Sequence, residues 1–224
     1  MDDPSRRGRV PPADASELKP FGDDEDEQFL TEEAEAEAEA VELLRRALPH
    51  LRTVPAPEDD LLAAAEAVRA GVAARTAPFP QIAAAAGWVG PPPSDDAELW
   101  LDATGALVAM RGEAGLPIDD EAAVLALQWT DWLGAVVGLV RAGVGASGRA
   151  SDLVRHIAAC PELDGGLDEL DRPLLEQAFE VVLPTWQATC ALDPEGRLTP
   201  LGQWGLPRAL AWAWNGDFDV DLPG

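Results

Sequence analysis

A glycine-rich segment of the sequence has the spacing that is typical of nucleotide binding. Gly143, Gly145 and Gly148 form the pattern G-x-G-x-x-G, and Asp164 follows at a distance that suits a contact with a ribose. In dinucleotide-binding folds such a loop places the pyrophosphate on a helix N-terminus. Here the preceding apolar run has the period of a helix, and no alternation of strands and helices follows. We therefore interpret the segment as a flexible glycine turn between two helices, and keep a nucleotide-binding enzyme as an alternative.

The residues that bind metals or act as nucleophiles are few. His50 and His156 are the two histidines, and Cys160 lies four residues after His156, which puts the pair on one face of a helix. A zinc site needs further ligands, and the other cysteine, Cys190, lies far along the chain. The single lysine, Lys19, lies in the N-terminal segment, so the body of the chain has no P-loop or Schiff-base lysine. These residues predict neither a metal nor another cofactor, and they favour a protein that is not an enzyme.

Two residues of the last predicted helix are of the types found in interaction surfaces. Arg208 and Trp212 are four residues apart, which places them on one face, away from the apolar stripe of Leu210 and Trp214. Tryptophan and arginine are enriched at the energetic centres of protein interfaces. The pair is therefore a candidate contact patch. The alternative is that Trp212 packs beneath a neighbouring loop.

The charge of the chain limits its partners. The 224 residues include 16 basic and 41 acidic side chains, which gives a formal net charge of −25. The acidic excess is present both in residues 1–40, with a net charge of −10, and in the remainder, with −15. Such a charge repels phosphate backbones at long range, so nucleic acid is not an expected partner. An acidic surface keeps a protein soluble, and an acidic tail also attracts a basic partner.

Cysteine content and hydropathy indicate a cytoplasmic protein. Two cysteines in a chain of this size do not make a disulfide framework. The acidic residues 23–27 stand where a secretion signal would have its apolar region. The most apolar stretch, residues 122–140, has Asp131 near its centre, where a charge is costly in a membrane. We predict no membrane segment, and the sequence specifies no oligomeric state.

Apolar periodicity predicts a mainly α-helical fold with two short β-hairpins. We expect a disordered acidic tail over residues 1–28, N-terminal helices over 29–77, a helical body over 78–216 and an acidic C-terminal tail over 217–224. Within the body, residues 119–140 have the stripe of one long helix, and the last helix begins near Pro207. The hairpins are predicted near residues 99–108 and 192–201, which share the pattern Leu-Asp-x-x-Gly-x-Leu. This weak internal repeat predicts two helix-plus-hairpin modules.

Several short strings carry a resemblance to a known group of proteins. They are Ala-Gly-Trp-Val-Gly at 86–90 before Thr104-Gly105-x-Leu107, the segment 133–141, Asp-Arg-Pro-Leu at 171–174 and Leu-Thr-Pro-Leu-Gly-Gln-Trp at 198–204. With the preference for arginine over lysine, they resemble uncharacterised actinobacterial proteins with winged-helix-like modules, some fused to domains of the plasmid pRiA4b ORF-3 type. The resemblance implies a helical bundle with one or two such modules and brings no catalytic residues. It also implies that residues 137–141 are a helix end that leads into a strand.

Together these observations predict a non-enzymatic protein-interaction or regulatory module, with a basic protein as its partner. A DNA-binding regulator of the winged-helix type, which would read DNA through a local arginine patch, is the first alternative. The nucleotide-binding enzyme built on Gly143–Gly148 is the second.

Overall fold

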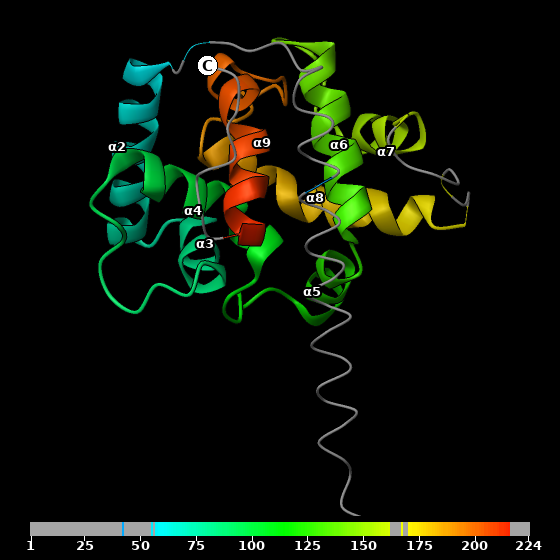
Figure 1. Ribbon diagram of the computed structural model, residues 1–224. Coiled ribbons are helices and arrows are strands. Elements are labelled where there is room, and N and C mark those ends of the chain that lie inside the picture. Colours follow the sequence, from blue (N-terminus) through cyan, green and yellow to red (C-terminus); the bar gives the residue numbers. More distant parts are fainter. Residues whose placement is uncertain (1–41, 43–54, 56, 162–166, 168–169, 216–224) are drawn as a thin grey trace, which may run out of the picture. The chain divides into compact units, whose positions relative to one another are not determined.

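The computed structural model describes Glu42, Pro55, residues 57–161, Leu167 and residues 170–215, which all belong to one compact unit spanning residues 36–224. Its helices are α2 (Glu58–Ala74), α3 (Phe79–Ala85), α4 (Asp96–Ala109), α5 (Ile118–Leu125), α6 (Trp129–Ala142), α7 (Ala150–Ala158), α8 (Arg172–Ala188) and α9 (Pro200–Asn215) (Figure 1). Within these residues the mainly helical fold is confirmed, and none of them forms a β-strand. The predicted tails over 1–28 and 217–224, His50 and Asp164 lie outside the described residues.

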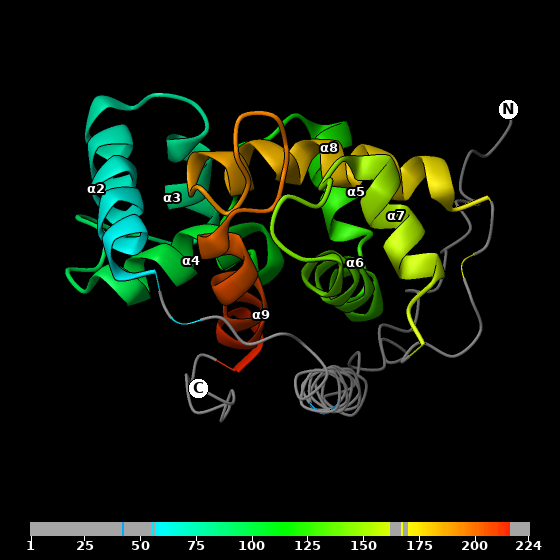
Figure 2. The ribbon, with the colours of Figure 1, turned by 90° about the horizontal axis from the view of Figure 1, so that it is seen from above.

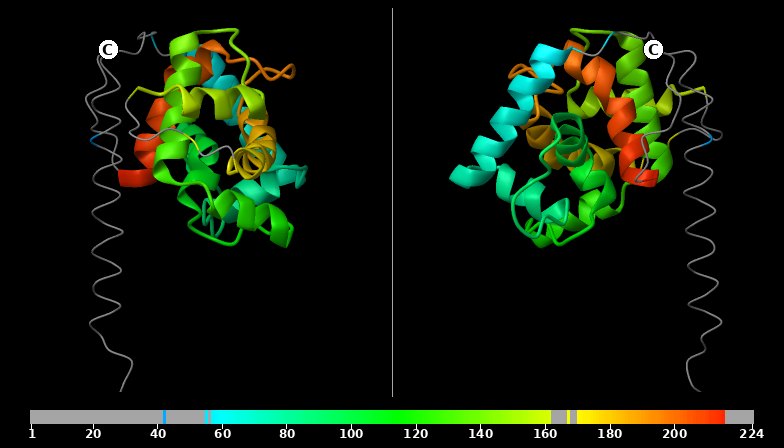
Figure 3. Two further views of the ribbon diagram at one scale, coloured as in Figure 1. Left: turned by 90° about the vertical axis from the view of Figure 1, so that its right-hand side faces the viewer. Right: turned by 60° about the vertical axis from the view of Figure 1, so that its left-hand side comes forward.

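Two groups of helices are joined through α8 and α9. α2 and α3 pack on each other and on α4, while α6 packs on α7. α8 contacts α3 and α4 as well as α5 and α7, and α9 packs on both α4 and α6. Figure 2 shows α8 running across both groups, with α2, α3 and α4 at the left and α5, α6 and α7 at the right; Figure 3 gives two side views. The buried apolar side chains of all these helices form one continuous core.

α4 is held closely against its neighbours by glycine contacts and one tryptophan. A Cβ atom at Gly105 of α4 would lie 2.9 Å from the backbone oxygen of Ala209 in α9, so glycine permits this close approach. The ring of Trp100 fills the space next to Gly205, where a Cβ atom would lie 2.3 Å from the ring. The Trp100 indole N–H donates to the backbone oxygen of Thr189, just after α8, at 2.7 Å. α4 is thus fixed to both α8 and α9.

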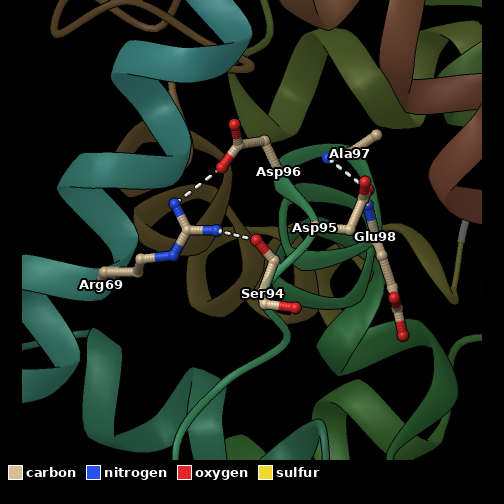
Figure 4. A network of polar contacts seen from close by, with 6 residues as sticks. All are labelled: Arg69, Ser94, Asp95, Asp96, Ala97 and Glu98. Atoms are coloured by element: carbon tan, nitrogen blue, oxygen red, sulfur yellow. Dashed lines mark hydrogen bonds and ion pairs between the residues drawn. The ribbon is translucent and has the colours of Figure 1, made fainter.

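A polar network fixes the start of α4 to α2 (Figure 4). The Asp95 carboxylate accepts hydrogen bonds at 3.0 and 2.9 Å from the backbone N–H groups two and three positions later, and so caps the helix. Arg69 of α2 donates to the Asp96 carboxylate at 2.7 Å and to the backbone oxygen of Ser94 at 2.8 Å. One arginine therefore ties α2 to the capped end of α4.

The hairpin predicted near residues 99–108 is wrong, because these residues lie within α4. The prediction treats Asp102 and Gly105 as turn residues. On the helix, Asp102 instead accepts hydrogen bonds from other side chains, and Gly105 allows the backbone of α9 to pack closely against α4. The leucines and alanines of α4 are good helix formers, and the cap at Asp95 starts the helix before the first predicted strand.

The single helix expected over residues 119–140 is two helices, α5 and α6, bent by 82°. The backbone N–H of Gln128 donates to the Asp131 carboxylate at 2.9 Å, in a capping box that starts α6. The polar residues inside the apolar stripe therefore mark a helix start. No single helix in the described ranges is long and apolar enough to cross a membrane, and only this bent pair taken together meets that criterion there.

The second predicted hairpin forms a turn without strands. Gly196 has a φ angle of 75°, and its N–H donates to the backbone oxygen of Asp193 at 2.9 Å, as the Asp-x-x-Gly pattern predicts. Leu192 and Leu198 form only an isolated bridge. The second strand has no room to extend, because α9 already begins at Pro200.

The winged-helix-like modules implied by the resemblance are not formed by these segments. The hairpin near 99–108 is absent, and the one near 192–201 is reduced to a turn with one antiparallel bridge. Residues 137–141 continue α6 to Ala142 instead of leading into a strand. The last helix begins at Pro200, before its predicted start near Pro207, and Pro207 lies inside it. The string Asp171-Arg172-Pro173 instead starts a helix, because α8 begins at Arg172 with a proline in its first turn.

Candidate functional site

Asp102 gathers three side-chain donors. Its carboxylate accepts hydrogen bonds from the Trp88 indole N–H at 3.1 Å and from Arg111 at 2.9 Å. The Trp212 indole N–H donates to the same carboxylate from α9. Asp102 is only 9% exposed, and a buried carboxylate needs such donors to offset its lost hydration. The cluster joins the loop before α4, α4 itself, the segment after it and α9.

The predicted contact pair, Arg208 and Trp212, makes two separate contacts within the chain. The Arg208 guanidinium lies 4.7 Å from the centre of the Trp204 ring, a cation–π geometry, and donates to the Trp204 backbone oxygen. Burial lowers the pKa of Arg208 from its ordinary value. Trp212 is half-buried and bonded to Asp102. A contact between this pair and another protein stays a prediction.

The glycine-rich segment joins α6 to α7, as a glycine turn requires. Gly143 and Gly145 adopt φ angles of 91° and 85°, which glycine tolerates without strain. The Gly145 N–H donates to the backbone oxygen of Leu198 at 2.7 Å, and the Gly148 N–H donates to that of Gly196 at 2.8 Å. A dinucleotide loop presents such N–H groups to the pyrophosphate. Here they bind the turn before α9, and the helix α6 stands where a dinucleotide-binding fold needs a strand.

His156 and Cys160 lie at the C-terminal end of α7. His156 packs tightly against α6, because a Cβ atom at Gly138 would lie 2.4 Å from the His156 Cβ. Burial lowers the pKa of His156, which favours the neutral imidazole. Cys160 is buried and is not part of a disulfide. Among the residues that the structure describes, no group of three or more His, Cys, Asp or Glu side chains could hold a metal ion. His156 is a packing residue between α6 and α7.

A cavity of about 380 Å³ lies where α3, α4, α5 and α8 come together. Leu107 of α4 and Thr185 of α8 are buried and line its inner part. Gln81, Asp120 and Glu180 line it from three different helices, and its lining contains no lysine, arginine or histidine. The Oε1 atom of Gln81 is buried and has no hydrogen-bond partner. The cavity thus combines apolar walls with a small number of polar and acidic side chains, which is typical of small-ligand sites.

Sequence reasoning missed both Asp102 and the cavity. For Asp102 a signal exists, because it is the only charged residue in the apolar run over 99–108, and a buried acid requires partners. For the cavity no comparable signal exists. Its polar residues come from separate helices and share no motif, so only the packing of those helices brings them together.

Comparisons with protein-family models, with curated proteins and with solved structures give no match to this chain. The resemblance to actinobacterial winged-helix-like proteins therefore stays a prediction. Function has to be argued from the residues of the chain itself.

Proposed function

We propose that this chain is a non-enzymatic interaction or regulatory module that binds a protein partner with a basic surface. The acidic excess carries the proposal, since the net charge of −25 is spread over both the first 40 residues and the remainder. A charge of this size and sign accelerates encounters with a basic surface and slows those with nucleic acid.

The use of arginine within the described residues supports this proposal. Arg69 pairs with Asp96 at 2.7 Å, Arg111 with Asp102 at 2.9 Å and Arg155 with Asp152 at 2.7 Å. In contrast, the first turns of α2 and α5 each carry three acidic side chains, namely Glu58, Asp59 and Asp60 in α2 and Asp119, Asp120 and Glu121 in α5. Arginines paired within the chain contribute little positive potential to a contact surface. The acidic turns contribute negative potential, with all three side chains exposed in α2, and with Asp119 exposed and the other two half-buried in α5.

The experiment measures selectivity, because any strongly acidic protein attracts cations. The full chain is titrated at about 150 mM salt, where exposed charges more than ~8 Å apart are screened, with basic peptides of identical composition but scrambled order. We expect Kd values that differ by more than about tenfold among peptides of equal charge, which corresponds to ~1.4 kcal/mol of specific recognition. Equal Kd values across the whole set would show that the chain binds the peptides through their charge alone, and would overturn the proposal.

Two sets of charge-neutralising substitutions then locate the contact. One replaces the five acids of residues 23–27 with their amides, and the other does the same to Glu58, Asp59 and Asp60 at the start of α2. We expect the first set to weaken the best peptide more than the second, since the acidic N-terminal segment is the predicted docking element. The reverse result would move the contact to α2.

Duplex DNA provides the test against the first alternative. A winged-helix regulator predicts a mobility shift at about 50 mM salt that weakens steeply as salt rises. We expect no shift, because the chain is acidic in both of its parts. A salt-sensitive shift would replace the proposed function with DNA binding.

A further inference from the structure

We propose that the cavity between α3, α4, α5 and α8 binds an aliphatic cation, that is, an ammonium or guanidinium group carried on a short apolar chain. A free amine fits this description without any protein partner, so the inference goes beyond the proposed function. A lysine or arginine side chain of a partner would present the same chemistry.

The charges of the lining favour a cation. Asp120 of α5 and Glu180 of α8 line the cavity, and no basic residue does. Glu180 is exposed and Asp120 is half-buried, so the two carboxylates lie toward the solvent side, whereas Leu107 and Thr185 are buried. Two carboxylates beside a low-dielectric interior attract a cation and repel phosphates and carboxylates.

The walls favour an apolar chain behind the cationic group. Leu107, Leu116 and Val181 contribute apolar lining from three segments. A hydrated inorganic cation would leave these surfaces uncovered, whereas the methylene groups of an aliphatic amine would cover them. The volume of about 380 Å³ is near the lower end of the ~300–1,000 Å³ range of ligand pockets. It suits a small amine or a single side chain rather than a dinucleotide.

Gln81 supplies a third acceptor. Its Oε1 atom is buried without a hydrogen-bond partner, although its side chain lines the cavity. A buried acceptor that lacks a donor is costly, and a donor from a ligand would remove that cost. An ammonium group has three N–H donors, and the lining offers two carboxylates and this carboxamide as acceptors.

Three probes of similar size test the chemistry. The full chain is titrated with n-butylammonium, with pentanoate and with n-pentanol, and binding is followed by NMR shifts of the Leu107 and Val181 methyl groups. We expect saturable shifts with butylammonium, weaker binding of the alcohol and none of the anion. Absence of saturable binding by the amine, or equal binding of the anion, would overturn the inference.

Matched variants connect the binding to the cavity. Glu180→Gln removes one carboxylate of the lining, and Glu176→Gln removes a carboxylate from α8 one turn earlier, outside the lining. We expect about a threefold to tenfold loss of amine affinity for Glu180→Gln and no change for Glu176→Gln. Val181→Phe fills the cavity without changing its charge and should abolish the shifts of the Leu107 methyl groups. Equal effects of the two glutamate variants would refute the assignment.

Capped tripeptides distinguish the two sources of the cation. Ala-Arg-Ala and Ala-Lys-Ala, both acetylated and amidated, are compared with Ala-Ala-Ala and with butylammonium. Tighter binding of either basic peptide than of the amine identifies a partner side chain as the occupant. Binding of the amine alone identifies a small molecule. Either result supports a cation site, and competition by Ala-Ala-Ala would contradict it.

Discussion

Replacing Asp102 with alanine should destabilise the fold more than its position on a single helix suggests. The carboxylate accepts hydrogen bonds from Trp88 before α4, from Arg111 after it and from Trp212 on α9. Alanine removes the carboxylate that all three donors share. The substitution therefore loosens three connections to α4 at once, while its own helix propensity favours the helix.

The size of the effect follows from the exposure of the donors. A hydrogen bond to a charged group is worth roughly 1.5–3 kcal/mol when it is buried. Both indoles are half-buried and Arg111 is 39% exposed, so water replaces part of each lost contact. Counting about 1 kcal/mol for each donor gives a loss of ~3 kcal/mol, a large part of the 5–15 kcal/mol that is typical of a domain.

Urea unfolding of the full chain measures this loss, with two comparison variants. Asp102→Asn retains one acceptor oxygen, so we expect about half the effect of alanine. Glu98→Ala removes an exposed acid from the same helix and should change stability by less than ~0.5 kcal/mol. If Asp102→Ala were as stable as Glu98→Ala, the cluster would contribute nothing and the reasoning would fail.

The other predictions concern backbone, pH and ligand. Gly105→Ala should destabilise by about 1–3 kcal/mol, although alanine ordinarily favours a helix, because the new Cβ would lie 2.9 Å from the Ala209 backbone oxygen; urea unfolding checks the sign. Gly196→Ala should cost about 1 kcal/mol, since the φ angle is 75° and no neighbour obstructs the Cβ, and Gly196→Asn should cost less. Burial lowers the pKa of His156 below its ordinary 6.5. The neutral imidazole therefore contributes fully to stability above pH 6.5, and this contribution is lost as the pH falls through the pKa of the folded state. His156→Gln should reduce the loss of stability that acidification from about pH 7 to 5.5 causes in the unsubstituted chain. NAD should not raise the melting temperature, because the N–H groups of Gly145 and Gly148 already bind the chain; a rise would revive the nucleotide-binding alternative.

Local chemistry explains which parts of the fold were predictable. The start of α8 follows from Arg172 and Pro173, since proline is preorganised for the first turn of a helix. The glycine turn between α6 and α7 follows from positions that adopt positive φ angles. The bend between α5 and α6 has a local cause as well, the capping box at Gln128, but the apolar stripe continues across it and conceals the break.

Tertiary packing explains what was missed at the candidate site. Asp120 and Glu180 become neighbours of one cavity only because α5 packs on α8, and no periodicity within either helix encodes that contact. The position of Gln81 was equally unpredictable from the sequence, because the packing of the surrounding helices is what buries its side-chain oxygen without a hydrogen-bond partner. Composition predicts that the chain is acidic. Only the packing of the helices shows that Asp120 and Glu180 line the same cavity.

The two Asp-x-x-Gly segments show how neighbouring residues decide between a helix and a turn. Ala103 and Thr104 separate Asp102 from its glycine, and both continue a helix that Asp95 has already capped. Pro194 follows Asp193 and lacks the N–H that a helix interior needs, so the chain turns at Gly196. The aspartates then have different uses. The Asp193 carboxylate accepts from the Arg197 backbone N–H at 2.8 Å within its own turn, whereas Asp102, held on a rigid helix, is free to connect segments up to 110 residues apart.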